Sequence, residues 1–336
     1  MAKIKIVQVS KAGQLDQIER ELPEPGINQV RIKVKACGVC HSDMFTRDVL
    51  WPNIQLPRVP GHEVAGVIDK IGIGVNHWKE GQRVGVGWVG AYCGQCVPCR
   101  RGDFITCQNL QISGIHFDGG YAEYMIAPVT ALAAIPDTLT FEEAAPLLCA
   151  GVTTYNALRQ SKARAGDLVA IQGIGGLGHL GIQFANKMGF KTVAISKGKE
   201  KEALAQKLGA HIYLNAENDD IAITLQKLGG ARVILATAPS GKSISPLVKG
   251  LGSQGELMIV GASNDPIEVT AIQLIASKLT MRGFASGTAI DSEDTMNFCA
   301  LTGIRPMIEK FPLEKVAQAY EHMITGRVRF RSVLLT

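Results

Sequence analysis

The sequence predicts an α/β protein of two domains, a β-rich domain followed by a doubly wound parallel sheet. The 336 residues are enough for about two domains of ordinary size. Residues 1 to about 145 consist largely of short segments in which apolar and polar residues alternate, broken by Gly and Pro. From about residue 166, apolar strands instead alternate with helical segments, the order expected when helices join parallel strands.

The composition, with 46% hydrophobic and 19% charged residues, is that of a folded globular protein rather than a disordered one. The net charge of +5 is scattered in short clusters, so nucleic-acid binding is not favoured. Residues 1–9 alternate instead of forming an apolar run, which predicts a first strand rather than a signal peptide. No apolar run approaches the ~18 residues of a membrane span, and we expect a cytoplasmic protein.

The first domain is predicted over residues 1–147. Its clearest strands are the alternating segments Gln29–Ala36, Val64–Ile68 and Arg83–Val86. Long segments without periodicity separate these strands. We therefore expect a β-rich domain whose loops carry function.

The second domain is predicted over residues 148–290. Its first strand, Leu168–Gln172, leads into a glycine-rich turn, and apolar or small residues then recur at helical spacing from 177 to 188. Further strands are expected at Thr192–Ser196, His211–Leu214, Val233–Ala236, Leu257–Val260 and Leu279–Phe284. Beyond them, a predicted helix at Pro312–Ile324 and a strand at Arg327–Leu334 do not fit another unit of this sheet, so residues 291–336 form a separate segment.

Seven of the eight cysteines fall into two sets that offer zinc ligands. The first set is Cys93, Cys96, Cys99 and Cys107, four thiolates within the lobe 91–109, which contains few apolar residues to bury. Four thiolates close a tetrahedral shell, so this set predicts a structural zinc. Cys299 stands apart and is expected to be a buried thiol in a helix.

The second set lies in Cys37–Asp43, Gly61–Glu63 and Cys149, which supply thiolates and an imidazole. Three such ligands leave the fourth tetrahedral position open for water or substrate, as in a catalytic zinc site. Cys37 and Cys40 could instead form a redox pair or half of a four-cysteine site. The other four cysteines already complete a closed site, so we interpret Cys37 as packing.

The pattern Gly173-x-Gly175-x-x-Gly178 follows an apolar strand and opens a helix, the context of a nicotinamide dinucleotide site. The glycines let the backbone approach the pyrophosphate at the helix N-terminus. The next strand ends at Ser196 without a carboxylate for the ribose 2′-hydroxyl. Ser196, Lys197, Lys199 and Lys201 instead suit a 2′-phosphate, so NADP(H) is predicted over NAD(H). Alternatively, the lysines are only the exposed start of a helix at Lys199–Leu208.

Together, the cysteine sets, the Gly-His-Glu triplet and the glycine turn resemble, in order, the zinc-dependent alcohol dehydrogenases of the medium-chain dehydrogenase/reductase superfamily. The resemblance covers essentially the whole chain. It implies a GroES-like barrel, a Rossmann domain and a C-terminal segment that returns to the catalytic domain. It also implies that Cys40, His62 and Cys149 bind the catalytic zinc, so that each chain holds two Zn2+ ions.

The same resemblance implies roles for the residues beside these ligands. Asp43 would be the hydrogen-bond partner of His62, and Glu63 would lie near the metal and bind it transiently during ligand exchange. Ser42 would hydrogen-bond the substrate oxygen and pass its proton outward. The chain has Phe45 where many relatives have a His that continues this relay, so the outer proton path must differ.

Trp51 and Trp88 match pocket-lining positions and would favour slim primary alcohols, although core packing would explain them equally. Residues of the cofactor site are expected near the pyrophosphate, the nicotinamide and the 2′-phosphate: His41, Thr153, Gly173, Gly175, Gly176, Leu177, Gly178, Ser196, Lys197, Lys201, Val260 and Arg327. For Arg327, a solvated strand end is the alternative.

The predicted activity is reversible hydride transfer between a primary alcohol or its aldehyde and NADP(H). A polyol or cinnamyl-type dehydrogenase using NAD(H) is an alternative on the same scaffold. A zinc-stabilised cofactor sensor without catalysis is a second alternative, disfavoured because it would not need Cys40, His62 and Cys149. Resemblance to microbial relatives favours a homotetramer.

Overall fold

The computed structural model describes residues 2–336, which divide into two compact units. One comprises the residues up to Val152 together with Ser286–Thr336, and the other comprises Thr153–Ala285. The sequence placed these two boundaries at residues 148 and 291. Within residues 2–336, no helix combines the length and the apolar character needed to cross a membrane.

The first unit is built on a seven-stranded sheet with β3 (Gln29–Val39) at its centre. Val30, Ile32 and Val34 of β3 are fully buried in the core of this unit. The sheet runs β16-β17-β3-β4-β5-β9, and β8 also pairs with β3. Its other strands are β4 (Val64–Ile71), β5 (Arg83–Val86), β8 (Tyr124–Pro128), β9 (Leu132–Ala134), β16 (Ile308–Pro312) and β17 (Arg331–Leu335).

Smaller elements complete the first unit. β1 (Lys3–Gln8) pairs with β2 (Asp16–Glu21), and β6 (Val89–Ala91) pairs with β7 (Gln111–Ile112). The helices are η1 (His41–Asp43), α1 (Met44–Arg47), α2 (Val97–Arg100), η2 (Val129–Ala131), α3 (Phe141–Pro146), α10 (Ala289–Thr302), η5 (Leu313–Lys315) and α11 (Val316–Ile324). Cys37 and Cys299 are fully buried, the environment expected for them.

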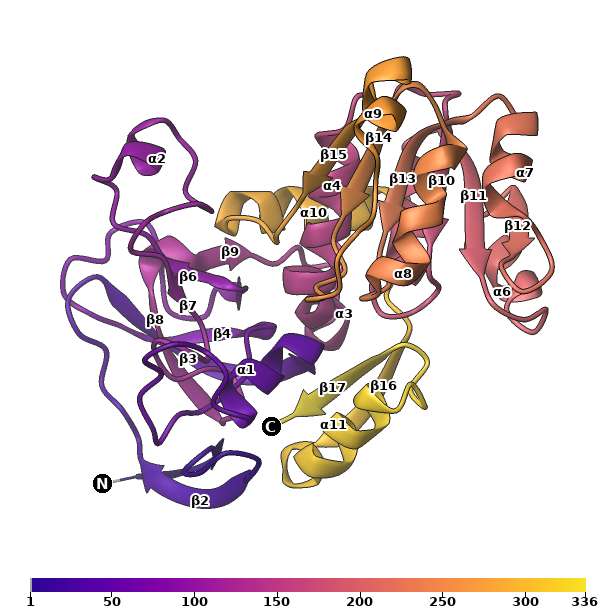
Figure 1. Cartoon of the computed structure of the whole chain (residues 1–336). Coiled ribbons are helices and arrows are strands. Elements are labelled where there is room, and N and C mark those ends of the chain that lie inside the picture. The colour runs from indigo at the N-terminus through magenta and orange to yellow at the C-terminus, as the bar shows by residue number, and fades with distance from the viewer. Residues whose placement is uncertain (1) are drawn as a thin grey trace. The chain divides into compact units, whose positions relative to one another are not determined.

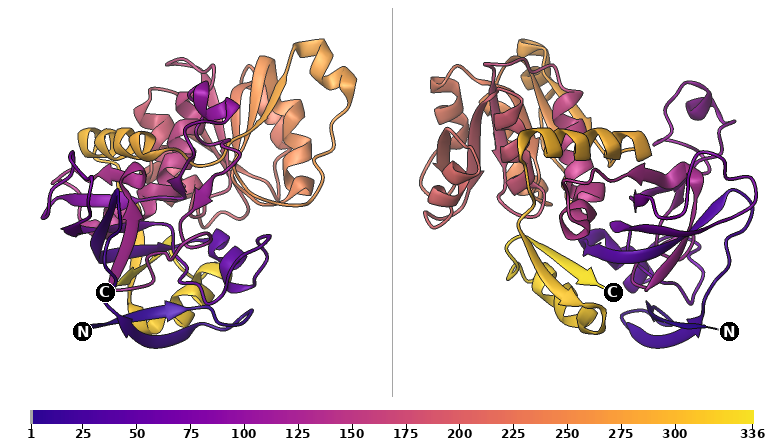
Figure 2. Two further views of the ribbon diagram at one scale, coloured as in Figure 1. Left: turned by 90° about the vertical axis from the view of Figure 1, so that its left-hand side faces the viewer. Right: turned by 180° about the vertical axis from the view of Figure 1, so that it is seen from behind.

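The C-terminal segment returns to this sheet. β17 pairs antiparallel with β3, and Ser332 lies opposite Val39. Figure 2 shows the segment beside the N-terminal strands, and Lys5 of β1 pairs with Glu314 at 2.9 Å.

The predicted helix is confirmed, because the 3-10 turn η5 begins at Leu313 and continues into α11, which ends at Ile324. The predicted strand begins at Arg331 rather than Arg327. Residues 308–312 are extended because β17 supplies their hydrogen-bond partners, which are not visible in the local pattern.

The second unit is a six-stranded parallel sheet in the order β12-β11-β10-β13-β14-β15 (Figure 1). Its strands are β10 (Leu168–Gln172), β11 (Lys191–Ser196), β12 (Ile212–Asn215), β13 (Ala231–Ala236), β14 (Leu251–Ile259) and β15 (Thr280–Gly283). Its helices are α5 (Gly178–Lys187), α6 (Glu202–Lys207), α7 (Ile221–Lys227), α8 (Gly241–Ile244), η4 (Ser245–Gly250) and α9 (Ala271–Ser277). The strand order reverses between β10 and β13, where such sheets bind ligands. The predicted α/β class is thereby confirmed.

A widened helical turn follows α3. Residues Leu147–Gly151 form a π-helical turn, η3, which continues into α4 (Val152–Arg159). Pro146 at the end of α3 has no N–H to continue the hydrogen-bond ladder. Such turns often occur at functional sites, and this one carries Cys149.

Candidate metal and cofactor sites

Three separate segments bring the predicted catalytic ligands together. Cys40 follows the last residue of β3, His62 and Glu63 directly precede β4, and Cys149 lies in η3. The ligand atoms of these four residues all lie within 4.8 Å of one another. The Sγ atoms of Cys40 and Cys149 are 3.8 Å apart.

The orientation of His62 leaves one ring nitrogen for a metal. Nδ1 of His62 lies 2.9 Å from Oδ1 of Asp43. A carboxylate only accepts hydrogen bonds, so Nδ1 carries a proton and Nε2 is the nitrogen left to face a metal. Nε2 is buried and has no hydrogen-bond partner within the described chain. A buried, unpaired nitrogen is costly unless it binds something, and a metal ion would satisfy it.

The charges around His62 also favour a cation. Contact with Cys149 holds the pKa of Cys40 well below its usual range despite burial, so Cys40 is the readier thiolate. Burial lowers the pKa of His62, but the negative charges of Asp43 and Cys40 outweigh burial and raise it well above its usual value. Positive charge is thus favoured at Nε2, where a metal cation would take the place of a proton. Two sulfurs and one imidazole fit Zn2+.

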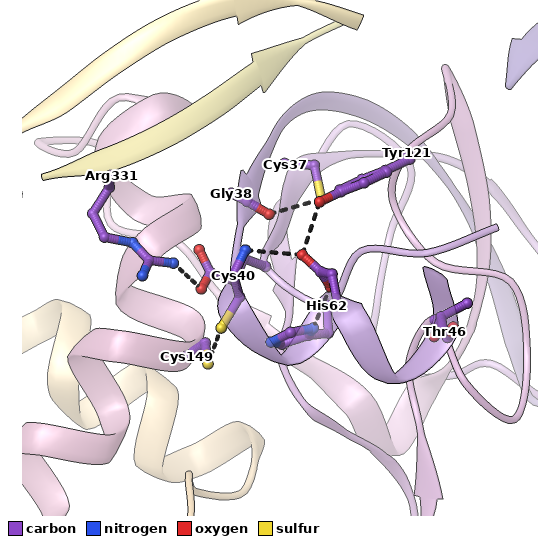
Figure 3. A network of polar contacts seen from close by, with 11 residues as sticks. Cys37, Gly38, Cys40, Thr46, His62, Tyr121, Cys149 and Arg331 are labelled. Carbon is purple, nitrogen blue, oxygen red and sulfur yellow. Dashed lines mark hydrogen bonds and ion pairs between the residues drawn. The ribbon is translucent and has the colours of Figure 1, made fainter. Parts of the chain in front are cut away.

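Glu63 is held by an arginine that the sequence analysis did not identify. Arg331 donates a hydrogen bond to Oε1 of Glu63, and both side chains are buried (Figure 3). Burial raises the pKa of Glu63 to about 7, against the opposing effect of Arg331. A side chain at Gly38 would collide with Glu63, so this glycine makes room for the carboxylate. The pairing of β17 with β3 brings Arg331 beside Cys40, a placement that no local sequence signal indicates.

A cluster of aromatic rings lies beside the candidate metal site. The rings of His62 and Trp88 lie 4.8 Å apart and nearly perpendicular. Trp88 lies 6.1 Å from Trp51, and Phe45 contacts both tryptophans. Both tryptophans are partly exposed rather than sealed in the core. The cluster can therefore form a wall beside the metal.

Ser42 and His41 lie in η1 directly after Cys40. Ser42 is half-buried and His41 is exposed. Ser42 therefore lies two residues after Cys40, one of the candidate ligands. The sequence predicted both residues only from the resemblance.

The second cysteine set lies in a single lobe. The Sγ atoms of Cys93, Cys96, Cys99 and Cys107 all fall within 4.8 Å of one another, with Cys93 and Cys107 3.6 Å apart. The backbone N–H groups of Cys93 and Asn109 donate to Sγ of Cys107. Backbone donors, first that of Gln95, lower the pKa of Cys93 to about 6. Burial and the neighbouring thiols, by contrast, raise the pKa of Cys99 to about 12, so the lobe favours a thiolate at Cys93 first. Four sulfurs this close together suit a closed zinc site.

The glycine turn begins directly after β10. A Cβ at Gly178 would lie 1.8 Å from the carbonyl oxygen of Gly173, so only glycine allows this packing. A Cβ at Gly175 would meet no protein atom within 4 Å, which leaves the backbone open to a ligand. α5 starts at Gly178, with Gly176 and Leu177 in the turn before it. Its N-terminus can thus receive a phosphate.

The segment after β11 carries the predicted 2′-phosphate residues. Ser196 is half-buried at the end of β11, Lys197 is exposed, and Lys201 precedes the first residue of α6. α6 therefore begins three residues later than predicted. The carboxylate of Glu200 folds back over Gly198, so one acid shares this segment with the lysines.

The remaining cofactor residues occupy scattered positions. Thr153 is buried in α4, and the N–H of Val260 donates to the carbonyl of Ala236, the last residue of β13. Arg327 is largely exposed and pairs with Glu321 at 2.5 Å. The phosphate contact of Arg327 stays a prediction.

Comparisons with known proteins find alcohol dehydrogenase relatives that match both units of the chain. The model of the alcohol dehydrogenase GroES-like domain matches residues 26–137, and that of the zinc-binding dehydrogenase matches residues 176–301. The chain is 45% identical over 320 residues to alcohol dehydrogenase patD of Penicillium expansum, covering 95% of this chain and 93% of that one.

Two further relatives show the same likeness. NADP-dependent alcohol dehydrogenase C of Mycobacterium bovis is 35% identical over 320 residues, covering 93% of this chain and 92% of that one. The solved cinnamyl alcohol dehydrogenase SbCAD4 from Sorghum bicolor superposes with a TM-score of 0.88 at 30% identity, covering 99% of this chain and 97% of that one. These matches confirm the predicted GroES-like and Rossmann architecture.

Proposed function

Because this chain belongs to the zinc-type alcohol dehydrogenases of the medium-chain dehydrogenase/reductase superfamily, we propose that it interconverts primary alcohols and aldehydes with NADP(H), at a catalytic zinc held by Cys40, His62 and Cys149. The observation that carries this proposal is the unpaired Nε2 of His62 facing two thiols. Cys93, Cys96, Cys99 and Cys107 hold a second, structural zinc.

The chain's own residues divide the work of the reaction. Asp43 keeps the proton on Nδ1 of His62, so that Nε2 stays available as a ligand. When bound, zinc supplies Lewis-acid polarisation of the substrate oxygen. The Ser42 hydroxyl, which both donates and accepts, takes the proton from that oxygen and passes it to water. Phe45, Trp51 and Trp88 shield the reacting carbon from solvent.

The choice of NADP(H) is based on the segment after β11. Ser196 and Lys197 can pair with a 2′-phosphate where an NAD site would place a carboxylate. The mycobacterial relative is named as NADP-dependent. The homotetramer and the cytoplasmic location stay predictions from the sequence.

A kinetic comparison tests the cofactor proposal. We would measure kcat/KM for ethanol, butanol and benzyl alcohol with NAD and with NADP, on the wild type and on Ser196→Asp. We expect NADP to be preferred by the wild type and Ser196→Asp to move the preference toward NAD, because the new carboxylate repels the phosphate. A wild type that prefers NAD would overturn the NADP assignment. A wild type without turnover in either direction would favour the cofactor sensor.

A cinnamyl-type alcohol is the second candidate substrate. The aromatic cluster of Phe45, Trp51 and Trp88 could stack on a conjugated ring. The likeness to SbCAD4 supports the same candidate. Adding cinnamyl alcohol to the series separates the two, since a kcat/KM well above that of butanol would identify the arylallyl substrate.

A further inference from the structure

Tyr121 lies beneath the predicted catalytic metal site, although it contacts no ligand atom of a metal. Its side chain is 1% exposed, and its O–H donates to Oδ2 of Asp43 at 2.8 Å (Figure 3). The backbone N–H of Cys40 donates to the same carboxylate oxygen at 2.8 Å. Oδ1 of Asp43 is left for Nδ1 of His62. Asp43 is therefore fixed on one side by Tyr121 and Cys40, and on the other it orients His62.

Tyr121 is also tied to the segment that carries His62. Its N–H donates to the carbonyl of Pro60, and Gly120 donates to the carbonyl of Gly61. A Cβ at Gly61, which has a φ of +100°, would lie 2.6 Å from the Tyr121 ring. The ring is therefore in close contact with the backbone directly before His62. The two ligand-bearing segments meet at this single side chain.

Tyr121 is the donor in its hydrogen bond with Asp43. Burial and the nearby charge of Asp43 raise the pKa of Tyr121 well above its usual value, so the phenol keeps its proton and donates. Asp43 is itself buried, and a buried carboxylate needs its full set of donors to stay in one orientation. Losing one donor would let the carboxylate rotate, and the imidazole would follow it.

We propose that Tyr121 is a positioning residue of the catalytic metal site, which acts by holding the carboxylate of Asp43 against His62. This inference rests on the proposed zinc site at Cys40, His62 and Cys149. It predicts that the Tyr121 hydroxyl slows the loss of that metal and leaves the metal of the four-cysteine lobe unaffected.

Zinc release into excess chelator, followed with a zinc-sensitive dye, tests the proposal without using activity. Release from the wild type should occur in two phases, and Cys40→Ala identifies the catalytic one by removing it. Tyr121→Phe keeps the ring and its packing. We expect it to speed the catalytic phase about tenfold, the lower end of the effect of outer hydrogen-bond partners on metal sites. The phase from the lobe should not change.

Tyr124→Phe is the matched control. Tyr124 lies on β8, three residues away, and its ring is packed near Arg31 and Lys33 rather than near the metal site. We expect both release phases of this variant to equal those of the wild type. Cobalt substitution gives a second readout, because the visible absorption of thiolate-bound Co2+ should change in Tyr121→Phe and stay constant in Tyr124→Phe.

A double-mutant cycle with Asp43→Asn tests whether Tyr121 acts through Asp43. If it does, Tyr121→Phe has no further effect on zinc release in the Asp43→Asn background. The same acceleration in both backgrounds would mean a packing role and would overturn the proposal, as would wild-type release from Tyr121→Phe. If Cys40→Ala holds as much zinc as the wild type, the proposed catalytic site is itself wrong. This result differs from every outcome that would overturn only the role of Tyr121.

Discussion

The two candidate zinc sites of this chain are assembled in opposite ways. The four-cysteine site takes all its ligands from one lobe, between Cys93 and Cys107, and stabilises sulfur with backbone N–H groups. The catalytic site gathers Cys40, His62 and Cys149 from the end of a strand, a loop and a π-helical turn. The first geometry depends on local chain conformation, whereas the second depends on the whole sheet of the first unit.

The difference extends to the surrounding charges. The lobe uses no carboxylate among its contacts to sulfur in the described chain. The catalytic site has two buried carboxylates, Asp43 and Glu63, and a buried arginine, Arg331. The two candidate sites therefore differ in the groups nearest to sulfur, which are ionisable side chains at one site and backbone N–H groups at the other.

Removing a ligand from the catalytic site should have the largest effect. We expect His62→Ala to lose the catalytic zinc and to lower kcat/KM on the order of a thousandfold or more, because Lewis-acid polarisation supplies several kcal/mol. Zinc analysis should show that one metal per chain remains. The exposed His77 provides the control, and His77→Ala should keep full activity and both metals. Retained turnover in His62→Ala would argue against the proposed ligand set.

The buried pair beside the catalytic site should have the next largest effect. Arg331→Met leaves Glu63 buried without its partner, and we expect a loss of about 3 kcal/mol or more in the free energy of unfolding. Urea unfolding of the zinc-loaded protein measures it, and Glu63→Gln combined with Arg331→Met should recover part of the loss. Arg327→Met breaks an exposed ion pair and should cost below ~1 kcal/mol. An equal loss in the free energy of unfolding for Arg331→Met and Arg327→Met would contradict the conclusion that burial makes the Glu63–Arg331 pair the more important of the two.

Breaking the lobe should lower stability without lowering activity per folded molecule. We expect Cys107→Ser to cost about 2 kcal/mol, a fall in Tm of roughly 4–8 °C for a unit of this size, since the lobe has few apolar contacts to replace the metal. Calorimetry gives Tm, and kcat/KM normalised to folded protein should stay within about twofold. A collapse of kcat/KM in the folded fraction would show that the two sites depend on each other.

The smallest effect concerns the helix that leads to Cys149. Glu142 of α3 accepts a hydrogen bond from Lys310 of β16 at 2.7 Å, and this contact lowers the pKa of Glu142 below 4.5. A depressed carboxyl pKa contributes stability above the unfolded value, which is lost as pH falls through the folded one. We expect Glu142→Gln to cost below ~1 kcal/mol near neutral pH and less at pH 3. Urea midpoints at the two pH values measure this, and a constant cost would contradict the ion-pair explanation.

The sequence by itself determined the elements whose signals are local. Leu168–Gln172 and Arg83–Val86 were predicted with their observed bounds, because apolar runs and alternation act within a few residues. The four-cysteine set and the glycine turn were recognisable for the same reason, since spacing alone fixes which groups can share a site. The resemblance then supplied the ligands Cys40, His62 and Cys149.

Only the tertiary structure decided which distant residues complete the catalytic site. Arg331 reaches Glu63 because β17 pairs with β3, and Tyr121 reaches Asp43 because its backbone bonds to the segment before His62. The same cause explains why residues 308–312 form a strand that the sequence analysis did not predict. Hydrogen bonds between segments far apart in the chain do not affect the hydrophobic periodicity of either segment. Which segments pair is therefore decided only when the sheet forms.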